Sequence, residues 1–123
     1  MTLVDTSIWI AHFRHEDLWL SRLLVSNAVL GHAFVTGEVA CGLMPDRSGR
    51  LRLLGELPQA RVAEPDEALA FIERHRLAGV GIGYVDAHLL AAAALTPPAR
   101  VWSGDKRLAA AAARLGLGVQ PDA

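Results

Sequence analysis

The stretch Met1-Thr-Leu-Val-Asp5-Thr6-Ser7-Ile-Trp-Ile10 is a short apolar run that stops at a carboxylate and then turns helical. The two apolar residues before the carboxylate are typical of a strand that is buried on both faces. Thr6 or Ser7 can cap the helix that follows. Asp5 is therefore expected at the carboxyl end of a central strand, the edge at which open α/β sheets bind their ligands.

Three carboxylates each stand as the only charged side chain in a long apolar segment: Asp5 in residues 1–13, Glu38 in residues 23–45 and Asp86 in residues 77–99. A buried carboxylate must be neutralised, paired with a cation or bound to a metal, because an isolated buried charge costs too much free energy. No Lys or Arg lies near any of the three in the sequence. We therefore expect the three acids to meet in space and to share a cation.

The length of 123 residues suits one domain, residues 1–123, with a single core. Hydrophobic residues make up 52% of the chain, and this surplus suggests that a partner covers some apolar surface. The net charge of -1 provides no overall field that favours nucleic acid. Eleven of the twelve basic residues are Arg, however, and Arg suits local binding of phosphate groups.

A cytoplasmic protein is expected from the cysteine content and from the apolar segments. The single cysteine, Cys41, excludes an internal disulfide and is interpreted as a small core residue of a helix. Asp5 interrupts the first apolar run, which argues against a secretory leader. The weakly charged segment 77–99 contains three glycines and two prolines, so it cannot be one membrane-spanning helix.

Strands and helices alternate along the predicted chain. Strands are expected at residues 3–4, 61–63 and 100–102, with a further short one at 117–119. Helices are expected at residues 8–13, 16–24, 33–44, 45–57, 64–77, 84–95 and 108–115. This alternation predicts an α/β fold with a parallel sheet and right-handed crossovers.

Asp105 repeats the arrangement around Asp5, because a strand, a small turn, an acid and a helix follow one another at both places. Two parallel strands that end in this way place both carboxylates at the same edge of the sheet. Glu38 and Asp86 can reach that edge from helices. Four acids at one edge suit a divalent cation such as Mg²⁺ or Mn²⁺, which takes oxygen ligands.

Each acid also has a structural alternative. Asp105 is as well explained by a helix N-cap as by a metal ligand. Asp86 can be a helix-start acid, and Glu38 can be a surface residue. Lys106 and Arg107 stand in the first turn of a helix, where the helix dipole disfavours cations. Nearby carboxylates or substrate phosphates would explain why two cations are tolerated there.

Two further features are interpreted as structural. His88 lies on an Ala-rich helix and is expected to be a satisfied core residue, since no His or Cys spacing resembles a zinc site. The glycine-rich residues 79–83 match neither a P-loop nor a dinucleotide fingerprint, and they are interpreted as a flexible entry to the helix that carries Asp86.

Four segments together resemble the PIN domain, and within it the VapC-type ribonuclease toxins of bacterial toxin-antitoxin modules. They are Val4-Asp5-Thr6-Ser7-Ile-Trp-Ile, Phe34-Val-Thr-Gly-Glu38-Val-Ala, Gly83-Tyr-Val-Asp86-Ala-His-Leu-Leu and Trp102-Ser-Gly-Asp105-Lys-Arg-Leu. The four follow the family's order over nearly the whole chain. Each segment alone is a weak signal, whereas the set is specific.

The resemblance implies a three-layer α/β/α sandwich on a short parallel sheet. It also implies Mg²⁺- or Mn²⁺-dependent cleavage of single-stranded or loop regions of RNA, a homodimer, and a small VapB-like antitoxin. Carried over by position, it assigns an acidic catalytic and metal site with two supporting hydroxyls: Asp5, Glu38, Asp86, Asp105, Thr6 and Ser103. Gly104 departs from the family, whose members often have a larger residue there, so Asp105 is the least firmly placed of the four acids.

The sequence therefore predicts a metal-dependent endoribonuclease, and two alternatives remain open. One is a Mg²⁺-binding phosphotransfer domain of the receiver or phosphatase type. Asp5 lacks the second Asp two residues on that such a phosphatase would show, and Thr6 replaces the adjacent acid of a receiver pocket. The other alternative is a non-catalytic PIN-like binding module. Basic residues that can line an RNA groove are Arg14, Arg47, Arg50 and Lys106.

Overall fold

Three short parallel strands form the sheet in the computed structural model, which describes residues 1–119 and 121. They are β1 (Thr2–Val4), β2 (Val29–Leu30) and β3 (Arg100–Trp102). The order is β2-β1-β3, and Leu3 of the central strand is in register with Leu30 and Val101. The first strand of the chain is thus the middle strand of the sheet, as its apolar residues predict.

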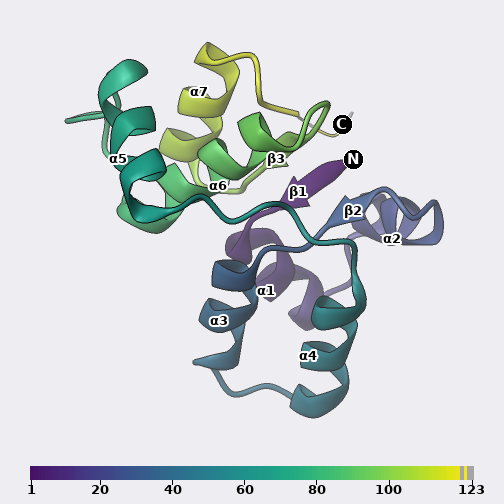
Figure 1. Ribbon diagram of the computed structural model, residues 1–123. Coiled ribbons are helices and arrows are strands. Elements are labelled where there is room, and N and C mark those ends of the chain that lie inside the picture. The colour runs from purple at the N-terminus through teal and green to yellow at the C-terminus, as the bar shows by residue number, and fades with distance from the viewer. Residues whose placement is uncertain (120, 122–123) are drawn as a thin grey trace.

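Helices cover both faces of this sheet (Figure 1). Those in the described residues are α1 (Thr6–Arg14), α2 (Leu18–Val25), α3 (Ala33–Ala40), α4 (Arg47–Glu56), α5 (Pro65–Arg74), α6 (Tyr84–Leu95) and α7 (Lys106–Arg114). Figure 1 shows α1, α3 and α4 on one side of β1 and α5, α6 and α7 on the other. The predicted α/β sandwich with a parallel sheet is confirmed. No helix within residues 1–119 and 121 is long and apolar enough to cross a bilayer.

The core forms where the sheet meets its most apolar helix. Leu3 and Val4 are fully buried, and every residue of α6 from Ala87 to Ala93 is also buried. Four of these α6 residues are alanines, which allow the helix to approach its neighbours closely. A helix that is buried over most of its surface needs no amphipathic pattern, and this explains why residues 84–95 read as a continuous apolar run.

The prediction of a strand at residues 61–63 is wrong, and the second strand is β2 instead. At this edge of the sheet only Gln59 bridges to Gly31, after which the chain turns away. The backbone N–H of Arg61 donates to the Thr96 hydroxyl at 3.1 Å, and its side chain pairs with Glu67 at 3.2 Å. Ala63 packs in a small separate apolar cluster. These partners hold the segment against α5 and α6 and away from the sheet.

Two other expectations also need correction. Residues 117–119 do not form a strand, because Gly118 makes only an isolated bridge to Val101. Helix α3 ends at Ala40 and not near residue 44. Cys41 is consequently the C-cap of α3 and is exposed, whereas the sequence pattern favoured a buried position.

Candidate active site

The carboxyl ends of the three strands lie at one edge of the sheet because all three strands are parallel. Asp5 directly follows β1, and Asp105 follows β3 after a short turn. A helix that leads into a parallel strand runs in the opposite direction, so the N-terminus of α6 lies at the same edge. Asp86 sits in the first turn of α6. The fold therefore directs three of the predicted acids to one edge.

Asp5 is buried, with 6% of its surface exposed, and both of its carboxylate oxygens accept hydrogen bonds. Oδ1 accepts from the Thr6 backbone N–H at 2.7 Å. Oδ2 accepts from the hydroxyl of Ser7 at 2.9 Å and from that of Ser103 at 2.6 Å. These donors compensate for the hydration that the carboxylate loses on burial, without any Lys or Arg.

The two serine hydroxyls also fix the turn that carries Asp105. Ser103 Oγ accepts from the Asp105 backbone N–H at 2.9 Å, and Ser7 Oγ accepts from the Gly104 N–H at 3.1 Å. A Cβ on Gly104 would make ordinary contacts, the nearest at 3.4 Å from Ser7 Oγ. The turns after β1 and β3 are thus joined through Asp5. Gly104 does not leave the turn untethered, although the sequence suggested a looser placement of Asp105.

Glu38 reaches the same region from α3. Its Oε1 accepts a hydrogen bond of 2.6 Å from the hydroxyl of Thr6, which is the first residue of α1. Glu38 itself is exposed. Thr6 therefore links the strand-end acid to the acid on α3, since its N–H binds Asp5 and its hydroxyl binds Glu38.

Asp86 lies within electrostatic reach of the other three acids. Partial burial raises the pKa of Asp86, and the negative charges of Asp5, Asp105 and Glu38 raise it further. The Gly83 backbone N–H, which donates to Asp86 Oδ2 at 3.1 Å, acts in the opposite direction. Like charges that disfavour ionisation at one site are the pattern expected where a cation is to be bound.

Asp105 caps its own helix. Oδ1 accepts from the backbone N–H groups of Arg107 at 2.9 Å and Leu108 at 3.1 Å. Asp5 is likewise the N-cap of α1, and Asp86 forms a capping interaction with Gly83. The structural alternatives for Asp105 and Asp86 are therefore both realised, whereas α1 is capped by Asp5 and not by Thr6 or Ser7 as expected. The cap at Asp105 uses Oδ1 and leaves its second carboxylate oxygen without a hydrogen-bond partner in the described residues.

The donor chemistry of this edge fits a hard divalent cation, because every candidate ligand is a carboxylate or hydroxyl oxygen. Within residues 1–119 and 121, however, no three His, Cys, Asp or Glu side chains are grouped closely enough to form a ready cage for an ion. Mg²⁺ needs no such cage, since it commonly binds through one or two carboxylates and keeps water and substrate phosphate in its remaining positions.

Comparison with known proteins identifies the fold family. The model of the PIN domain family matches residues 2–114 of the chain. The chain belongs to the PIN domain family. Two curated relatives, both named Ribonuclease VapC32, come from Mycobacterium tuberculosis strains CDC 1551 / Oshkosh and ATCC 25618 / H37Rv. Each is 45% identical over 117 residues, which cover 95% of this chain and 94% of the relative. The predicted resemblance to VapC-type PIN domains is confirmed.

This PIN domain has an aromatic and histidine ladder that the sequence patterns did not reveal. His32 follows β2, caps α3 by accepting the Phe34 N–H at 3.0 Å, and lies beside the Phe34 ring. Phe34 contacts His88 of α6, with ring centroids 4.7 Å apart, and His88 contacts Tyr84 at 4.6 Å. The ladder joins α3, which carries Glu38, to α6. It was missed because β2, which precedes His32, is only two residues long.

Burial keeps both histidines neutral. It lowers the pKa of His32 to about 4, with a smaller contribution from repulsion between the two rings when both are protonated, and it lowers the pKa of His88. His32 Nε2 and His88 Nδ1 are buried without a hydrogen-bond partner in the described part of the chain. The expectation of a buried structural His88 is correct, but the expectation that its polar atoms are satisfied is not.

Two of the basic residues suggested for an RNA groove are engaged elsewhere in this PIN domain. Arg47 donates to the carbonyl groups of Ala40 at 2.6 Å and Gly42 at 3.3 Å. The guanidinium of Arg50 lies 4.8 Å from the centroid of the Phe13 ring. These contacts fasten α4 to neighbouring helices, so they give Arg47 and Arg50 a structural role.

Proposed function

We propose that residues 1–123 form a single nuclease domain that acts in the cytoplasm as an Mg²⁺- or Mn²⁺-dependent endoribonuclease on single-stranded or loop regions of RNA. The observation that carries this proposal is the arrangement of acids at the carboxyl edge of the sheet, where Thr6 links Asp5 to Glu38 and Ser103 links Asp5 to the turn that carries Asp105. The name of the VapC32 relatives, which describes them as ribonucleases, supports the substrate class. PIN family membership favours this function over the phosphotransfer alternative.

In this proposal Asp5, Glu38, Asp86 and Asp105 hold the cation and are the catalytic acids. Asp5 is the most firmly oriented, because three donors fix its oxygens. Glu38 and Asp86 are more accessible to a substrate, as each keeps exposed surface. Asp105 contributes its second oxygen while the first caps α7. Thr6 and Ser103 are supporting residues, since their hydroxyls orient Glu38 and Asp5.

A bound divalent cation would lower the pKa of a water molecule and offset the negative charge of the scissile phosphate. The carboxylates of this chain then have two tasks, to fix the position of the cation and to accept a proton from the attacking water. Asp86 is assigned the second task, because it lies partly exposed in the first turn of α6, where water can reach it. Attack by water, and not by the ribose 2′-hydroxyl, leaves a 5′-phosphate and a 3′-hydroxyl.

A small VapB-like antitoxin is proposed to neutralise the enzyme. An apolar hollow of about 370 Å³ lies between α1, α3 and α4, with Ile10, Phe13, Val39, Leu43 and Met44 among its lining residues. Leu43 is 97% exposed, so this surface is incompletely covered. An amphipathic helix would fill such a hollow. Because α3 also carries Glu38, an Arg or Lys side chain of the antitoxin helix can reach the acids and displace the metal.

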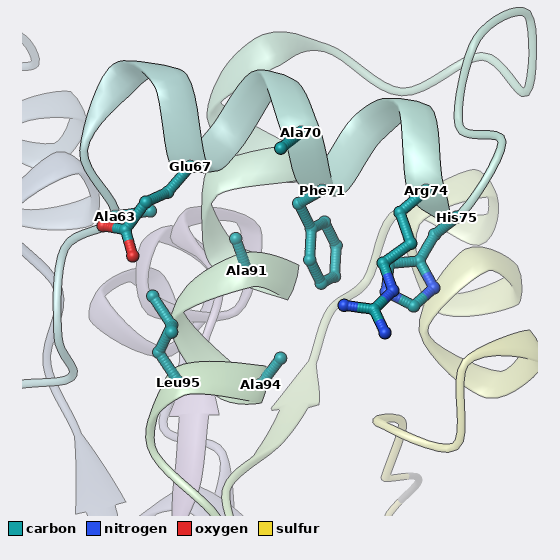
Figure 2. A pocket seen from close by; sticks show the side chains of 9 residues that line it. All are labelled: Ala63, Glu67, Ala70, Phe71, Arg74, His75, Ala91, Ala94 and Leu95. Carbon is teal, nitrogen blue, oxygen red and sulfur yellow. The ribbon is translucent and has the colours of Figure 1, made fainter.

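A homodimer is proposed to form through α5 and α6. These helices enclose a hollow of about 400 Å³, and Figure 2 shows the Phe71 ring extending from α5 toward α6. Leu69 on α5 is 58% exposed. Glu67 and Arg74 both line the hollow, seven residues apart on α5. Two copies of α5 packed antiparallel about a two-fold axis would therefore place Glu67 of each copy near Arg74 of the other.

The proposal is tested by incubating total RNA with the purified protein in Mg²⁺, in Mn²⁺ and in EDTA. Asp86→Asn is the test variant, and Asp66→Asn is the matched control, because Asp66 is an exposed acid in the first turn of α5. Cleavage is expected for the wild type and the control in metal, and for neither in EDTA. Equal cleavage by Asp86→Asn and the control would refute the assigned site.

A further inference from the structure

A second hollow combines basic side chains with an apolar floor. It measures about 310 Å³, at the lower end of the range of small-ligand sites, which is about 300–1,000 Å³. Its walls come from α7 and from the loop before α6, and they consist of Val80, Lys106, Arg107, Ala110, Ala111 and Arg114. Three cations and no acid line this hollow, although the whole chain carries a net charge of -1.

Two of these cations have no anionic partner among the described residues. Within residues 1–119 and 121, the ion pair closer than 4 Å joins Arg61 to Glu67, and it involves neither Lys106 nor Arg107. Lys106 and Arg107 are exposed and stand in the first turn of α7, where the helix dipole acts against positive charge. An anion from outside the chain would compensate both charges.

The third cation has a structural task. Arg114 Nη2 donates to the carbonyl group of His75 at 2.7 Å and also to that of Arg76 at 3.5 Å. These bonds fasten the segment after α5 to α7 and so hold one wall of the hollow in place. Lys106 and Arg107 are therefore the residues free to bind a ligand.

The hollow adjoins the acidic edge through its two walls. Lys106 directly follows Asp105, so one wall begins where the acidic site ends. On the other wall, a Cβ on Gly81 would lie 2.5 Å from Arg107 Cδ, and Gly81 has a φ of +89°, so only glycine allows this close approach. Gly83, two residues further on, donates its N–H to Asp86.

We infer that this hollow binds the RNA strand on one side of the scissile phosphate. Lys106 and Arg107 contact backbone phosphates, and Val80, Ala110 and Ala111 supply an apolar surface for a base or ribose. The inference rests on the proposed ribonuclease function and assigns the substrate track of that same site. A polyanion with apolar bases matches both features of the hollow, whereas an acidic protein segment would match only its charge.

The experiment measures binding and cleavage separately. A fluorescent 12-nucleotide single-stranded RNA of mixed sequence is titrated in EDTA, where no cleavage is expected, at several salt concentrations. The test variant is Lys106→Gln/Arg107→Gln, and Arg107→Lys is the charge-conserving variant. Arg52→Gln is the matched control, because Arg52 is exposed on α4, outside the hollow. Melting temperatures verify that every variant is folded, and an acidic peptide of equal charge is titrated in parallel.

Each phosphate contact to a single strand contributes about 0.7 to the slope of log affinity against log salt. At about 0.1 M salt this corresponds to roughly fivefold in affinity per contact. The double variant should therefore bind roughly 25-fold more weakly, with a salt slope smaller by about 1.4. Arg107→Lys and Arg52→Gln should bind like the wild type, and the acidic peptide should bind weakly.

The inference would be overturned if the double variant bound RNA with the same affinity and salt slope as Arg52→Gln. Preferential binding of the acidic peptide would also overturn it. If the wild type still cleaves RNA in metal, the proposed function survives that result. If the wild type cleaves no RNA in any metal, the proposed function fails. A loss of RNA binding in the double variant would then still support the hollow as an RNA site.

Discussion

Asp86→Asn should stabilise the metal-free protein, because it removes one of four mutually repelling charges and keeps the shape of the side chain. At a separation of about 8 Å and an effective dielectric constant of about 40, one pair of charges repels by roughly 1 kcal/mol. Three such pairs involve Asp86. After screening by water and salt, and after weakening of the Gly83 hydrogen bond, about 0.5–1.5 kcal/mol should remain.

For a domain of this size that gain corresponds to a rise of roughly 2–6 °C in melting temperature. The assay is thermal unfolding of wild type and Asp86→Asn at pH 7 in EDTA and in Mg²⁺ or Mn²⁺. Metal at 100 times the dissociation constant should raise the unfolding free energy of the wild type by about 2.7 kcal/mol through mass action, and so raise its melting temperature. The variant should gain less from metal. A variant less stable than the wild type in EDTA, or equally stabilised by metal, would refute the reasoning.

Three further predictions concern other parts of the structure. Ser103→Ala should cost about 1–3 kcal/mol, measured by denaturant unfolding, and should lower the cleavage rate, because it leaves Asp5 Oδ2 with one hydroxyl donor; an unchanged rate would contradict the supporting role. The pKa of His32 is about 4 in the folded protein and near 6.5 in the unfolded chain. The stability that follows from this difference is therefore fully present above pH 6.5 and is lost as the pH falls toward 4. The wild type should thus lose about 2 kcal/mol of unfolding free energy between pH 7 and 5, and His32→Asn, which retains a helix cap, should lose less. Arg74→Glu should shift the protein toward monomer in light scattering, because Glu67 of the other copy would then face a like charge. An unchanged dimer would place the interface elsewhere.

The sequence predicted the parts of the fold whose physical signal is local. A buried strand that ends in an acid and leads into a helix is readable at Asp5, and the same pattern repeats at Asp105. The cap of the first helix was not predicted correctly, since Thr6 or Ser7 was expected and Asp5 itself caps α1. The apolar run 84–95 formed α6 as expected, because a fully surrounded helix needs no polar face. These segments carry their own periodicity, length or capping signal, so no knowledge of distant partners is needed to place them.

Features that depend on distant partners were not predictable. The two residues of β2 are too few to show a pattern, and they form a strand only because β1 lies alongside. Residues 61–63 have strand-like composition, but Thr96 and Glu67 draw Arg61 away from the sheet. Asp5, Glu38 and Asp86 could be named from their apolar neighbourhoods, and Asp105 from the pattern that it shares with Asp5. Their hydrogen bonds could not, since the contact between Ser103 and Asp5 joins positions 98 residues apart.

The chemistry of the RNA ends tests the central claim most directly. A single-stranded RNA labelled at either end is incubated with the wild type in Mn²⁺, in Mg²⁺ and in EDTA, and the ends of each fragment are identified. A metal-dependent hydrolase with water as nucleophile predicts fragments with 5′-phosphate and 3′-hydroxyl ends, which appear in metal and are absent in EDTA. Fragments with 2′,3′-cyclic phosphate ends, or cleavage that continues in EDTA, would contradict the account.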